Sequence, residues 1–137
     1  MNISTKGRYG LRAILDIAQN GVEKPVTLSA ISARQDISDG YLEQLVAPLK
    51  KAGLVISIRG AQGGYLLSRP ADEITVGEVF RALEGPIAIT VCSTDDADVD
   101  CGRGESCLVR NLWCEIQDAV SAVLDSKTLT DLLPKCK

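Results

Sequence analysis

The clearest pattern of apolar and polar positions lies between residues 37 and 68. Within it, four apolar residues fall at positions i, i+3, i+4 and i+7, the spacing of one helix face: Leu42, Leu45, Val46 and Leu49. Gly53 ends this predicted helix. Two β-prone runs follow, at 54–58 and 65–68, and the loop between them, 59–64, is rich in glycine. Such runs on either side of a turn-forming loop indicate a β-hairpin. The stretch therefore predicts a helix that leads directly into a hairpin.

A first helix is predicted near the start of the chain. Its apolar stripe has the same spacing: Leu11, Ile14, Leu15 and Ala18. Ser4 or Thr5 can cap this helix, and Asn20-Gly21 ends it. Three basic residues lie near the cap: Lys6, Arg8 and Arg12. They are placed either to meet phosphate or to form a solvated basic face, and the context of the helices and hairpin that follow favours phosphate.

A helix-turn-helix is predicted immediately before the hairpin. Its first helix runs from Leu28 to Gln35, and residues 36–40 form the turn, in which Ser38 is suited to cap the recognition helix. Pro48 lies inside that second helix, where a proline removes one backbone hydrogen bond at a cost of about 3 kcal/mol. We therefore expect a kink, or an irregular helix after about Ala47. Together with the hairpin, these helices predict a winged helix-turn-helix.

Further helices are predicted in the second half of the chain. One begins at residues 72–75 and ends at Gly85-Pro86, and its stripe is Val76, Val79, Phe80 and Leu83. A short extended run, 87–91, precedes a polar cysteine-bearing segment. Ser106 then begins the last long helix, and residues 128–133 add one or two helical turns before a frayed tail.

The last long helix carries an apolar stripe that includes a tryptophan. One helix at the end of a small chain cannot easily cover such a stripe, which predicts that a second copy of the chain covers it. The residues expected at this homodimer interface are Leu112, Ile116, Val120 and Val123. The predicted fold is mainly α with a small β-hairpin wing. A winged helix-turn-helix domain spans 1–85, and the cysteine loop and long dimerisation helix span 86–137.

The charge of the chain is divided unevenly between its halves. The formal net charge of the whole chain is −3. Residues 1–70 carry nine Lys and Arg against five Asp and Glu, a balance of +4, whereas residues 71–137 carry six against thirteen, a balance of −7. Only the surface that faces phosphate has to be positive, so this division fits a DNA-binding head joined to a separate regulatory part.

The length and composition indicate one ordinary globular domain, or one domain with a dimerisation arm. The chain has 137 residues, of which 45% are hydrophobic, enough to form a core. It contains no run of about 20 apolar residues that would span a membrane, and its N-terminus lacks the apolar region of a signal peptide. We therefore expect a cytoplasmic protein without a membrane partner.

Seven residues of the head are predicted to contact double-stranded DNA: Lys6, Arg8, Ser38, Tyr41, Gln44, Lys51 and Arg59. Glutamine can form two hydrogen bonds with adenine in the major groove. Arginine is attracted by the negative potential of a narrow minor groove, and the glycines after Arg59 leave it free to reach there. The alternative is a winged helix used only for protein contacts, which the basic head disfavours.

Three of the five cysteines lie in one polar, acidic segment: Cys92, Cys101 and Cys107. A buried cysteine is often only a small apolar residue, but this segment is not apolar. Thiolates in loops are the usual ligands of iron–sulfur centres or zinc, and the other alternative is a thiol redox sensor without metal. Cys114 is expected to be packed on the long helix, and Cys136 to be exposed and without a role.

The same segment offers little support for an enzyme. The acidic run 95–100 could bind a cation, but it lacks the ligand spacing of a calcium loop. The chain has no histidine and no glycine-rich phosphate loop, so no catalytic set is apparent. The prediction is that the protein is not an enzyme.

Nearly the whole chain resembles the winged-helix regulators typified by IscR, NsrR and CymR. The matching motifs are Ser4 to Tyr9, Tyr41 to Leu45, Lys51 to Val55, Arg59-Gly60, Gly63 to Leu66, Thr75 to Val79 and Cys101 to Trp113. The resemblance implies a dimeric transcription regulator whose recognition helix enters the major groove and whose wing enters the minor groove. It also implies that the cysteine loop holds an iron–sulfur cluster, with 2Fe-2S favoured and 4Fe-4S as the alternative.

The cluster ligands of that family are matched only in part. The gap from Cys92 to Cys101 is eight residues rather than the usual five, and Arg110 stands where cluster-assembly regulators have a histidine. Other members recruit an acidic residue from the partner's first helix, where this chain has Arg8 and Arg12. The fourth ligand is therefore open. A carboxylate oxygen of the loop is preferred to the thiolate of Cys114. On a continuous helix, Cys114 would lie about 10 Å from Cys107, too far for both to bind one small cluster.

Taken together, the residues and the resemblance predict a dimeric repressor that binds a palindromic operator under the control of a cluster or of the redox state of its cysteine loop. The alternative is a regulator without a cluster that senses through thiols or through a protein partner, as in the control of cysteine metabolism.

Overall fold

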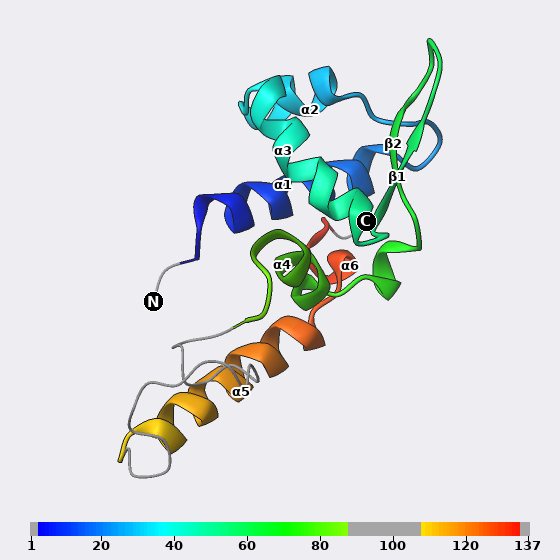
Figure 1. The fold of residues 1–137 in the computed structure, drawn as a ribbon. Helices are drawn as coiled ribbons and strands as arrows, with labels where there is room; N and C mark the ends of the chain where they lie inside the picture. The colour runs from blue at the N-terminus through cyan, green and yellow to red at the C-terminus, as the bar shows by residue number, and fades with distance from the viewer. Residues whose placement is uncertain (1–2, 88–107, 135–137) are drawn as a thin grey trace.

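The chain folds into a helical head with a hairpin at one side and a long helix that extends away from it (Figure 1). The computed structural model describes residues 3–87 and 108–134. The elements in chain order are α1 (Thr5–Asn20), α2 (Leu28–Gln35), α3 (Asp39–Lys51), β1 (Val55–Ile58), β2 (Gly64–Leu67), the 3-10 turn η1 (Ala71–Glu73), α4 (Val76–Glu84), α5 (Arg110–Ser126) and α6 (Leu129–Leu132). The mainly α fold with a β-hairpin wing is confirmed.

Side-chain caps set the starts of the first three helices. The Ser4 hydroxyl accepts a hydrogen bond from the Gly7 N–H at 3.1 Å and, at the start of α2, that of Thr27 accepts one from Ala30 at 3.1 Å. Ser38 caps α3 in the same way. Each cap satisfies a backbone donor that has no partner inside the helix, a contribution of about 1 kcal/mol. The expected cap at Ser38 is confirmed.

The turn between α2 and α3 is shorter than expected. The sequence predicted a turn over 36–40, but Asp39 and Gly40 already belong to α3. Asp36 ends α2 in the left-handed conformation, with φ of 55°, and its N–H donates to the Ser32 carbonyl. Ile37 is buried beneath the turn. The left-handed conformation of Asp36 changes the direction of the chain. Only Ile37 and the capping residue Ser38 then separate Asp36 from the first residue of α3.

Helix α3 continues through Pro48 to Lys51. The expectation of an irregular helix after Ala47 is therefore wrong. Pro48 loses one backbone hydrogen bond, yet its carbonyl still accepts from the Ala52 N–H at 3.0 Å. Leu49, in the same turn, is fully buried. Burial of a leucine is worth about 2 kcal/mol, which offsets much of the cost of the proline.

The hairpin is antiparallel, and one residue of the loop before α2 forms a β-bridge to strand β2. Val55 pairs with Leu67 and Ile58 with Gly64. Val26 forms a bridge to Tyr65, with hydrogen bonds of 3.0 and 2.8 Å between their backbones. A side chain at Gly64 would lie 2.6 Å from the Val26 carbonyl oxygen, so this close approach requires glycine.

Helix α4 begins later than predicted. Residues 72–75 were expected to start it, but Asp72 and Glu73 belong to η1, and Ile74 is extended and fully buried. Thr75 caps α4, and Glu78 completes a capping box by accepting from the Thr75 N–H at 2.9 Å. The buried Ile74 separates the two elements because its side chain has to enter the core.

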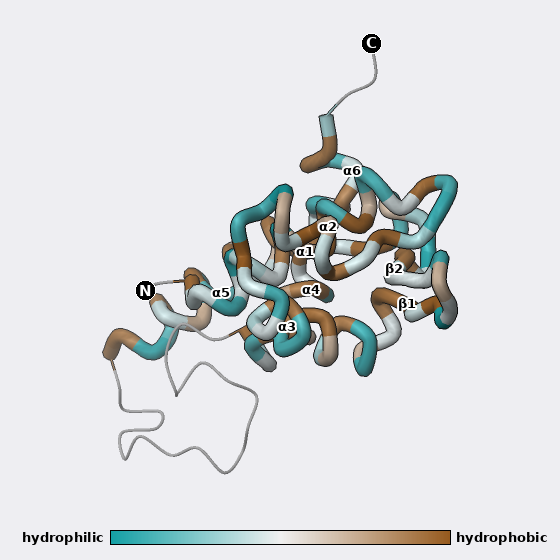
Figure 2. Tube along the Cα trace, turned by 90° about the horizontal axis from the view of Figure 1, so that it is seen from above, coloured by the Kyte–Doolittle hydropathy of each residue, from teal (hydrophilic) through white to brown (hydrophobic). Residues whose placement is uncertain are grey.

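The core lies where α1, α3 and α4 meet, and Figure 2 shows apolar segments gathered in the interior of the head. Helix α1 approaches α4 closely. A Cβ at Gly7 would lie 2.4 Å from Glu84 Oε1, and one at Gly10 would lie 2.3 Å from a methyl carbon of Leu83. The stripe predicted for α3 is confirmed, since Leu42, Leu45, Val46 and Leu49 are all buried.

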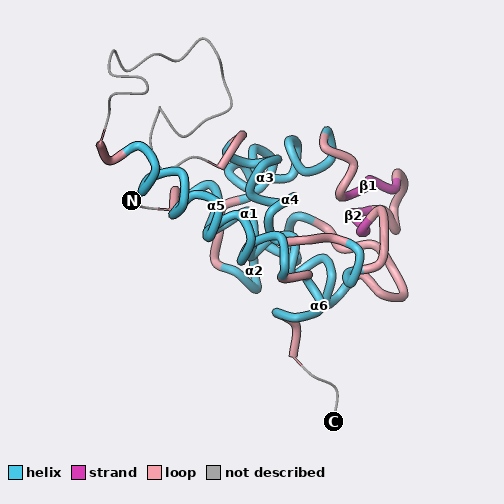
Figure 3. The backbone as a smooth tube through the Cα atoms, turned by 90° about the horizontal axis from the view of Figure 1, so that it is seen from below, coloured by secondary structure: helices cyan, strands magenta, loops and turns pink. Residues whose placement is uncertain are grey.

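Helix α5 extends away from the head, and its start and the hairpin lie on opposite sides of the molecule in Figures 1 and 3. It begins at Arg110, after a turn at Leu108 and Val109, and not at Ser106 as predicted. None of its residues is buried. The chain then returns to the head, where Leu129 of α6 is fully buried.

Several expectations concern residues outside the part that the structure describes. These are most of the extended run 87–91, the cysteines Cys92, Cys101 and Cys107, and the end of the tail from residue 135 onward. Within the described residues, no helix is long and apolar enough to cross a membrane.

Candidate nucleic-acid interface

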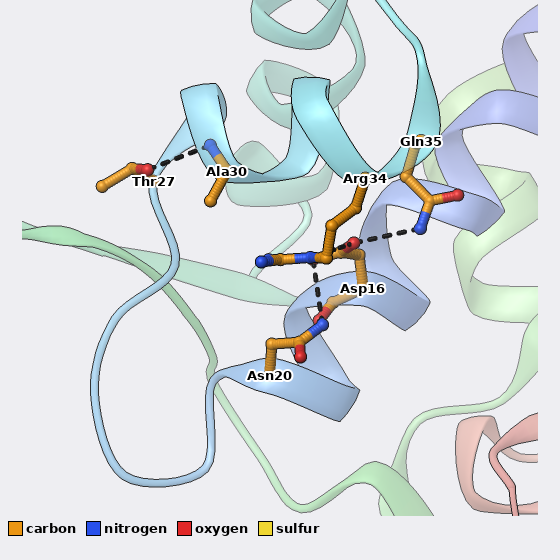
Figure 4. A network of polar contacts seen from close by, with 6 residues as sticks. All are labelled: Asp16, Asn20, Thr27, Ala30, Arg34 and Gln35. Carbon is orange, nitrogen blue, oxygen red and sulfur yellow. Dashed lines mark hydrogen bonds and ion pairs between the residues drawn. The ribbon is translucent and has the colours of Figure 1, made fainter.

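A buried carboxylate positions the helix-turn-helix against α1 (Figure 4). Asp16 is only 2% exposed, and its two oxygens receive hydrogen bonds from Arg34, at 2.7 Å from Nη2 to Oδ1 and 2.9 Å from Nε to Oδ2. Gln35 Nε2 donates to Oδ2 at 3.0 Å, and Asn20 donates to Oδ1 at 3.3 Å. Such fork-like pairs fix the relative orientation of two helices. The end of α2 is thereby held on α1.

The pKa of Asp16 is lowered from its ordinary value of 3.8. Burial of the carboxylate raises this pKa, but the hydrogen bonds from Arg34, Gln35 and Asn20, together with the charge of Arg34, lower it by more. Asp16 is therefore ionised at neutral pH. The ion pair between Asp16 and Arg34 is therefore present in the folded head at neutral pH.

Arg12 strengthens the same junction. Its Nη2 donates to the Gln35 carbonyl at 2.7 Å, and its Nε donates to Gln35 Oε1 at 3.2 Å. The Gln35 carbonyl lies in the last turn of α2, where carbonyls lack helical partners. The sequence suggested a phosphate contact for Arg12, but the structure directs its guanidinium to α2.

Tyrosines link the start of α1 to the start of α3. The rings of Tyr9 and Tyr41 meet edge to face, with centroids 6.1 Å apart. The guanidinium carbons of Arg8 and Arg12 lie 5.8 and 5.2 Å from the centre of the Tyr9 ring, within the range of cation–π attraction. Tyr41 is half-buried in this contact. These residues join α1 and the recognition helix at one edge of the head.

The remaining predicted DNA contacts are on the surface. Lys6 and Arg8 are exposed in the first turns of α1, Gln44 is exposed on α3, and Lys51 is exposed at its end. Ser38 is exposed, and its oxygen accepts the capping hydrogen bond from Tyr41. The opposite face of α3 is buried in the core, so this helix presents its polar face outward.

The loop of the hairpin presents an exposed arginine. Arg59 directly follows β1, and Gly60 has a φ of +112°, which a side chain would strain. The Gly63 N–H donates to the Gly60 carbonyl at 3.0 Å and closes the turn. Ile56 and Ile58 are 43% and 40% exposed along β1. The wing thus has a basic tip on a strand with partly exposed apolar residues.

Sequence reasoning did not identify the Asp16 network or the tyrosine pair. One signal for the network is visible in the sequence, because Asp16 stands beside Ile17 and three residues after Ala13, both of which are buried. A charged residue on the apolar face of a helix needs a partner. No comparable signal pairs Tyr9 with Tyr41, since both positions suit exposed residues equally well.

The described residues hold one cysteine, Cys114, which is half-buried on α5 and free. Among residues 3–87 and 108–134, no three histidine, cysteine or acidic side chains are grouped to hold a metal. The predicted ligands Cys92, Cys101 and Cys107 lie outside these ranges.

Comparison with known proteins places this architecture in one family. Residues 3–135 match the Rrf2 model, described as an iron-dependent transcriptional regulator. The transcriptional regulator CymR of Bacillus subtilis strain 168 is 48% identical over 132 residues, covering 96% of this chain and 89% of CymR. IscR of Serratia proteamaculans strain 568 is 43% identical over 133 residues, covering 97% of this chain and 79% of IscR.

A solved structure supports the same assignment. The structure of CymR (YrzC), the global cysteine regulator of B. subtilis, matches with a TM-score of 0.78 at 47% identity, and the match covers 96% of this chain and 95% of CymR. Its fold agrees with the winged helix-turn-helix described above. These relatives are named as regulators of transcription and not as enzymes. The chain therefore belongs to the Rrf2 family of winged helix-turn-helix, DNA-binding transcriptional regulators.

Proposed function

We propose that this protein is a dimeric repressor that reads a palindromic operator with α3 in the major groove and the wing in the minor groove. The observation that carries the proposal is the arrangement of the head. The buried face of α3 packs in the core, its exposed face bears Gln44 and Lys51, and Arg59 is exposed at the tip of the adjacent hairpin. A helix and a basic wing on one head are the parts of a two-groove reader.

The proposed contacts differ in what they contribute. Gln44 and Arg59 read sequence or groove shape, whereas Lys6, Arg8 and Lys51 bind phosphate and position the head. Ser38 and Tyr41, at the start of α3, are the remaining residues of the proposed DNA-binding surface. The Asp16 network and the Tyr9 contact act indirectly, because they hold α2 and α3 in place on α1.

Dimerisation through α5 is the second part of the proposal. In α4, the apolar stripe is buried within the chain, whereas none of the α5 residues is buried. Leu112 and Val123 are 48% and 58% exposed, and Ile116 and Val120 are half-buried. A second copy related by a two-fold axis would cover this stripe, and it would place two heads on two half-sites.

Control by the cysteine loop is the third part. Three thiolates are a suitable donor set for an iron–sulfur cluster, which would be held by Cys92, Cys101 and Cys107. An oxygen from the acidic run 95–100 or from Glu105 is the proposed fourth ligand. When bound, such a cluster supplies a centre that can be oxidised or lost as a signal. Its type is proposed to be 2Fe-2S, with 4Fe-4S as the alternative.

The late start of α5 bears on the choice of the fourth ligand. The distance of about 10 Å between Cys107 and Cys114 applies to a continuous helix, but α5 begins at Arg110. The geometric objection to Cys114 is therefore weaker than the sequence indicated. The oxygen ligand is still preferred, since Cys114 is half-buried on the helix.

A second candidate is a regulator that senses without a cluster. CymR of B. subtilis, named as a global cysteine regulator, is 48% identical to this chain, compared with 43% for IscR of S. proteamaculans. The chain also has Arg110 in place of the histidine found in cluster-assembly regulators. Both facts favour sensing through thiols or through a protein partner in the control of cysteine metabolism.

Selection of bound sequences from random double-stranded DNA, with protein purified without oxygen, tests the proposed function. Iron and sulfide are measured on the same preparation. The proposal expects enrichment of one two-fold symmetric site, together with about stoichiometric iron and sulfide. Enrichment without iron would favour the second candidate. Absence of any enriched sequence would contradict both.

A further inference from the structure

The C-terminal end of α5 is joined to the last turn of α4 by a paired contact between Asp125 and Arg81, and neither residue is among the proposed contacts to DNA. Arg81 Nη1 donates to Asp125 Oδ1 at 2.7 Å, and Nη2 donates to Oδ2 at 2.9 Å. The hydrogen bonds from Arg81 are the main cause of the lowered pKa of Asp125. Two parallel bonds fix direction as well as distance. The pair therefore restrains the angle between the two helices.

Gly77 makes room for this pair. A Cβ at Gly77 would lie 1.9 Å from Asp125 Oδ1 and 2.9 Å from Arg81 Nη1, so any side chain there would displace the carboxylate. Gly77 belongs to the motif Thr75 to Val79 that supports the family resemblance. Its backbone is helical, and glycine is unfavourable inside a helix. The close approach of Asp125 gives a physical reason for a glycine at this position.

Backbone hydrogen bonds close the same junction. The Val76 N–H donates to the Lys127 carbonyl at 2.8 Å, and the Leu129 N–H donates to the Ile74 carbonyl at 3.0 Å. Leu129 is fully buried in the core of the head. Helix α5 is thus held at its C-terminal end, and it extends away from the head toward its start (Figure 1).

We propose that Asp125, Arg81 and Gly77 are positioning residues that set the angle of α5 on the head, and so determine which spacing between two half-sites the dimer accepts. The inference rests on the proposed dimer through α5. With 17 residues, α5 is about 25 Å long, so a tilt of about 10° at its held end moves the other end by about 4 Å. One base pair adds about 3.4 Å of length to DNA. A small change of angle therefore corresponds to a whole base pair of spacing.

The test uses the full chain and a set of operator probes in which one or two base pairs are inserted or removed between the half-sites. Wild-type protein should prefer one spacing. In Asp125→Asn, we expect this preference to fall roughly five-fold or more, the lower end of typical coupling between sites. Affinity for a single half-site and the mass of the dimer should stay unchanged. A residue needed only for stability would instead lower the affinity for every probe alike.

Gly77→Ala provides an independent route to the same result. It retains both charges and suits a helix better than glycine, yet its methyl group would displace the Asp125 carboxylate. The spacing preference should fall as it does in Asp125→Asn. Asp72→Asn, which removes an exposed acid from η1, is the matched control and should retain the wild-type preference.

The outcomes separate this inference from the proposed function. If wild-type protein shows no spacing preference, the dimeric reader is wrong and the inference fails with it. If wild-type protein prefers one spacing and both Asp125→Asn and Gly77→Ala keep that preference, the dimeric reader stands and the inference alone is wrong.

Discussion

Asp16 and Arg34 form a pair in which one partner is buried and the other is partly exposed. The side chain of Asp16 is 1% exposed, whereas that of Arg34 is 41% exposed. The cost of burying the Asp16 carboxylate is offset by hydrogen bonds from neighbouring donors on α1 and α2. Because Arg34 belongs to the first helix of the helix-turn-helix, this pair ties the DNA-reading unit to the rest of the head.

Asp16→Ala should lower the free energy of unfolding by about 1.5–3 kcal/mol, the range for hydrogen bonds to a charged group. Arg34 remains hydrated in the variant, so it adds no large penalty. Urea unfolding of the two proteins measures the difference. Asp125→Ala removes an exposed pair and is the control, with an expected loss below about 1 kcal/mol. Equal losses in the two variants would contradict the special role of the buried carboxylate.

The same pair should make stability depend on pH in acid. The pKa of Asp16 is lowered in the folded state, so the unfolded chain binds this proton more readily. The contribution to stability is complete only above about pH 5, roughly one unit above the ordinary pKa of 3.8, and it is lost progressively as the pH falls through the folded pKa. The stability difference between wild type and Asp16→Asn should therefore shrink below about pH 5. A difference that stays constant from pH 6 to pH 3 would show that the lowered pKa is wrong.

The sequence predicted the elements whose evidence is local. The stripe from Leu42 to Leu49 and the cap at Ser38 depend on spacing and on side chains close in the chain, and both are confirmed. The expectation of an irregular helix after Ala47 was wrong because the cost of a proline is local, whereas the burial that offsets it comes from the whole core. The context favoured a phosphate contact for Arg12, whereas in the structure its guanidinium donates to a carbonyl 23 residues away in the chain.

The remaining features depend on contacts between segments that are distant in the chain. Gly7 and Gly10 allow α1 to approach α4, and Leu129 returns to the core beside Ile74. Nothing in the residues around Leu129 distinguishes it from other apolar residues of the C-terminal part. Such packing becomes visible only when the helices are placed in three dimensions.

Ile116→Asp combined with Val120→Asp should convert the proposed dimer to monomers. Each large apolar side chain lost from a packed interface costs about 2–4 kcal/mol, and a two-fold interface loses it twice. Sedimentation measures the mass. Binding to a palindromic site should weaken as the dimer is lost, because a monomer contacts only one half-site. Val22→Asp, which changes an exposed residue of the head, is the control and should leave the mass unchanged. A full dimer in the double variant would place the interface elsewhere.

Replacement of Cys92, Cys101 or Cys107 by Ala should abolish the visible absorbance of a cluster in protein purified without oxygen. Three thiolates are needed to hold the iron. Cys114→Ala is the matched change in the same region, and it should retain the absorbance. Retention in Cys92→Ala would remove that residue from the ligand set, and loss in Cys114→Ala would replace the oxygen ligand with a fourth thiolate.

Lys51→Ala should weaken binding to all DNA sequences by a similar factor. A lysine that neutralises one phosphate releases about one counterion, so the slope of log K against log salt should become smaller by about 0.9. Gln44→Ala should instead reduce the preference for the cognate base at one position and leave the salt slope unchanged. Filter binding at several salt concentrations, with cognate and altered operators, separates the two effects. A base-specific loss in Lys51→Ala would contradict its assignment to phosphate.

The most direct test of the two-groove reader is the affinity of Arg59→Ala for the selected operator and for unrelated DNA, measured beside wild type at one salt concentration. A contact that reads DNA is worth about 1–3 kcal/mol. The account predicts a loss of roughly ten-fold or more on the operator, with a much smaller loss on unrelated DNA, so that discrimination between them declines. Unchanged affinity of Arg59→Ala for the operator would contradict the assignment of the hairpin as a DNA-reading wing.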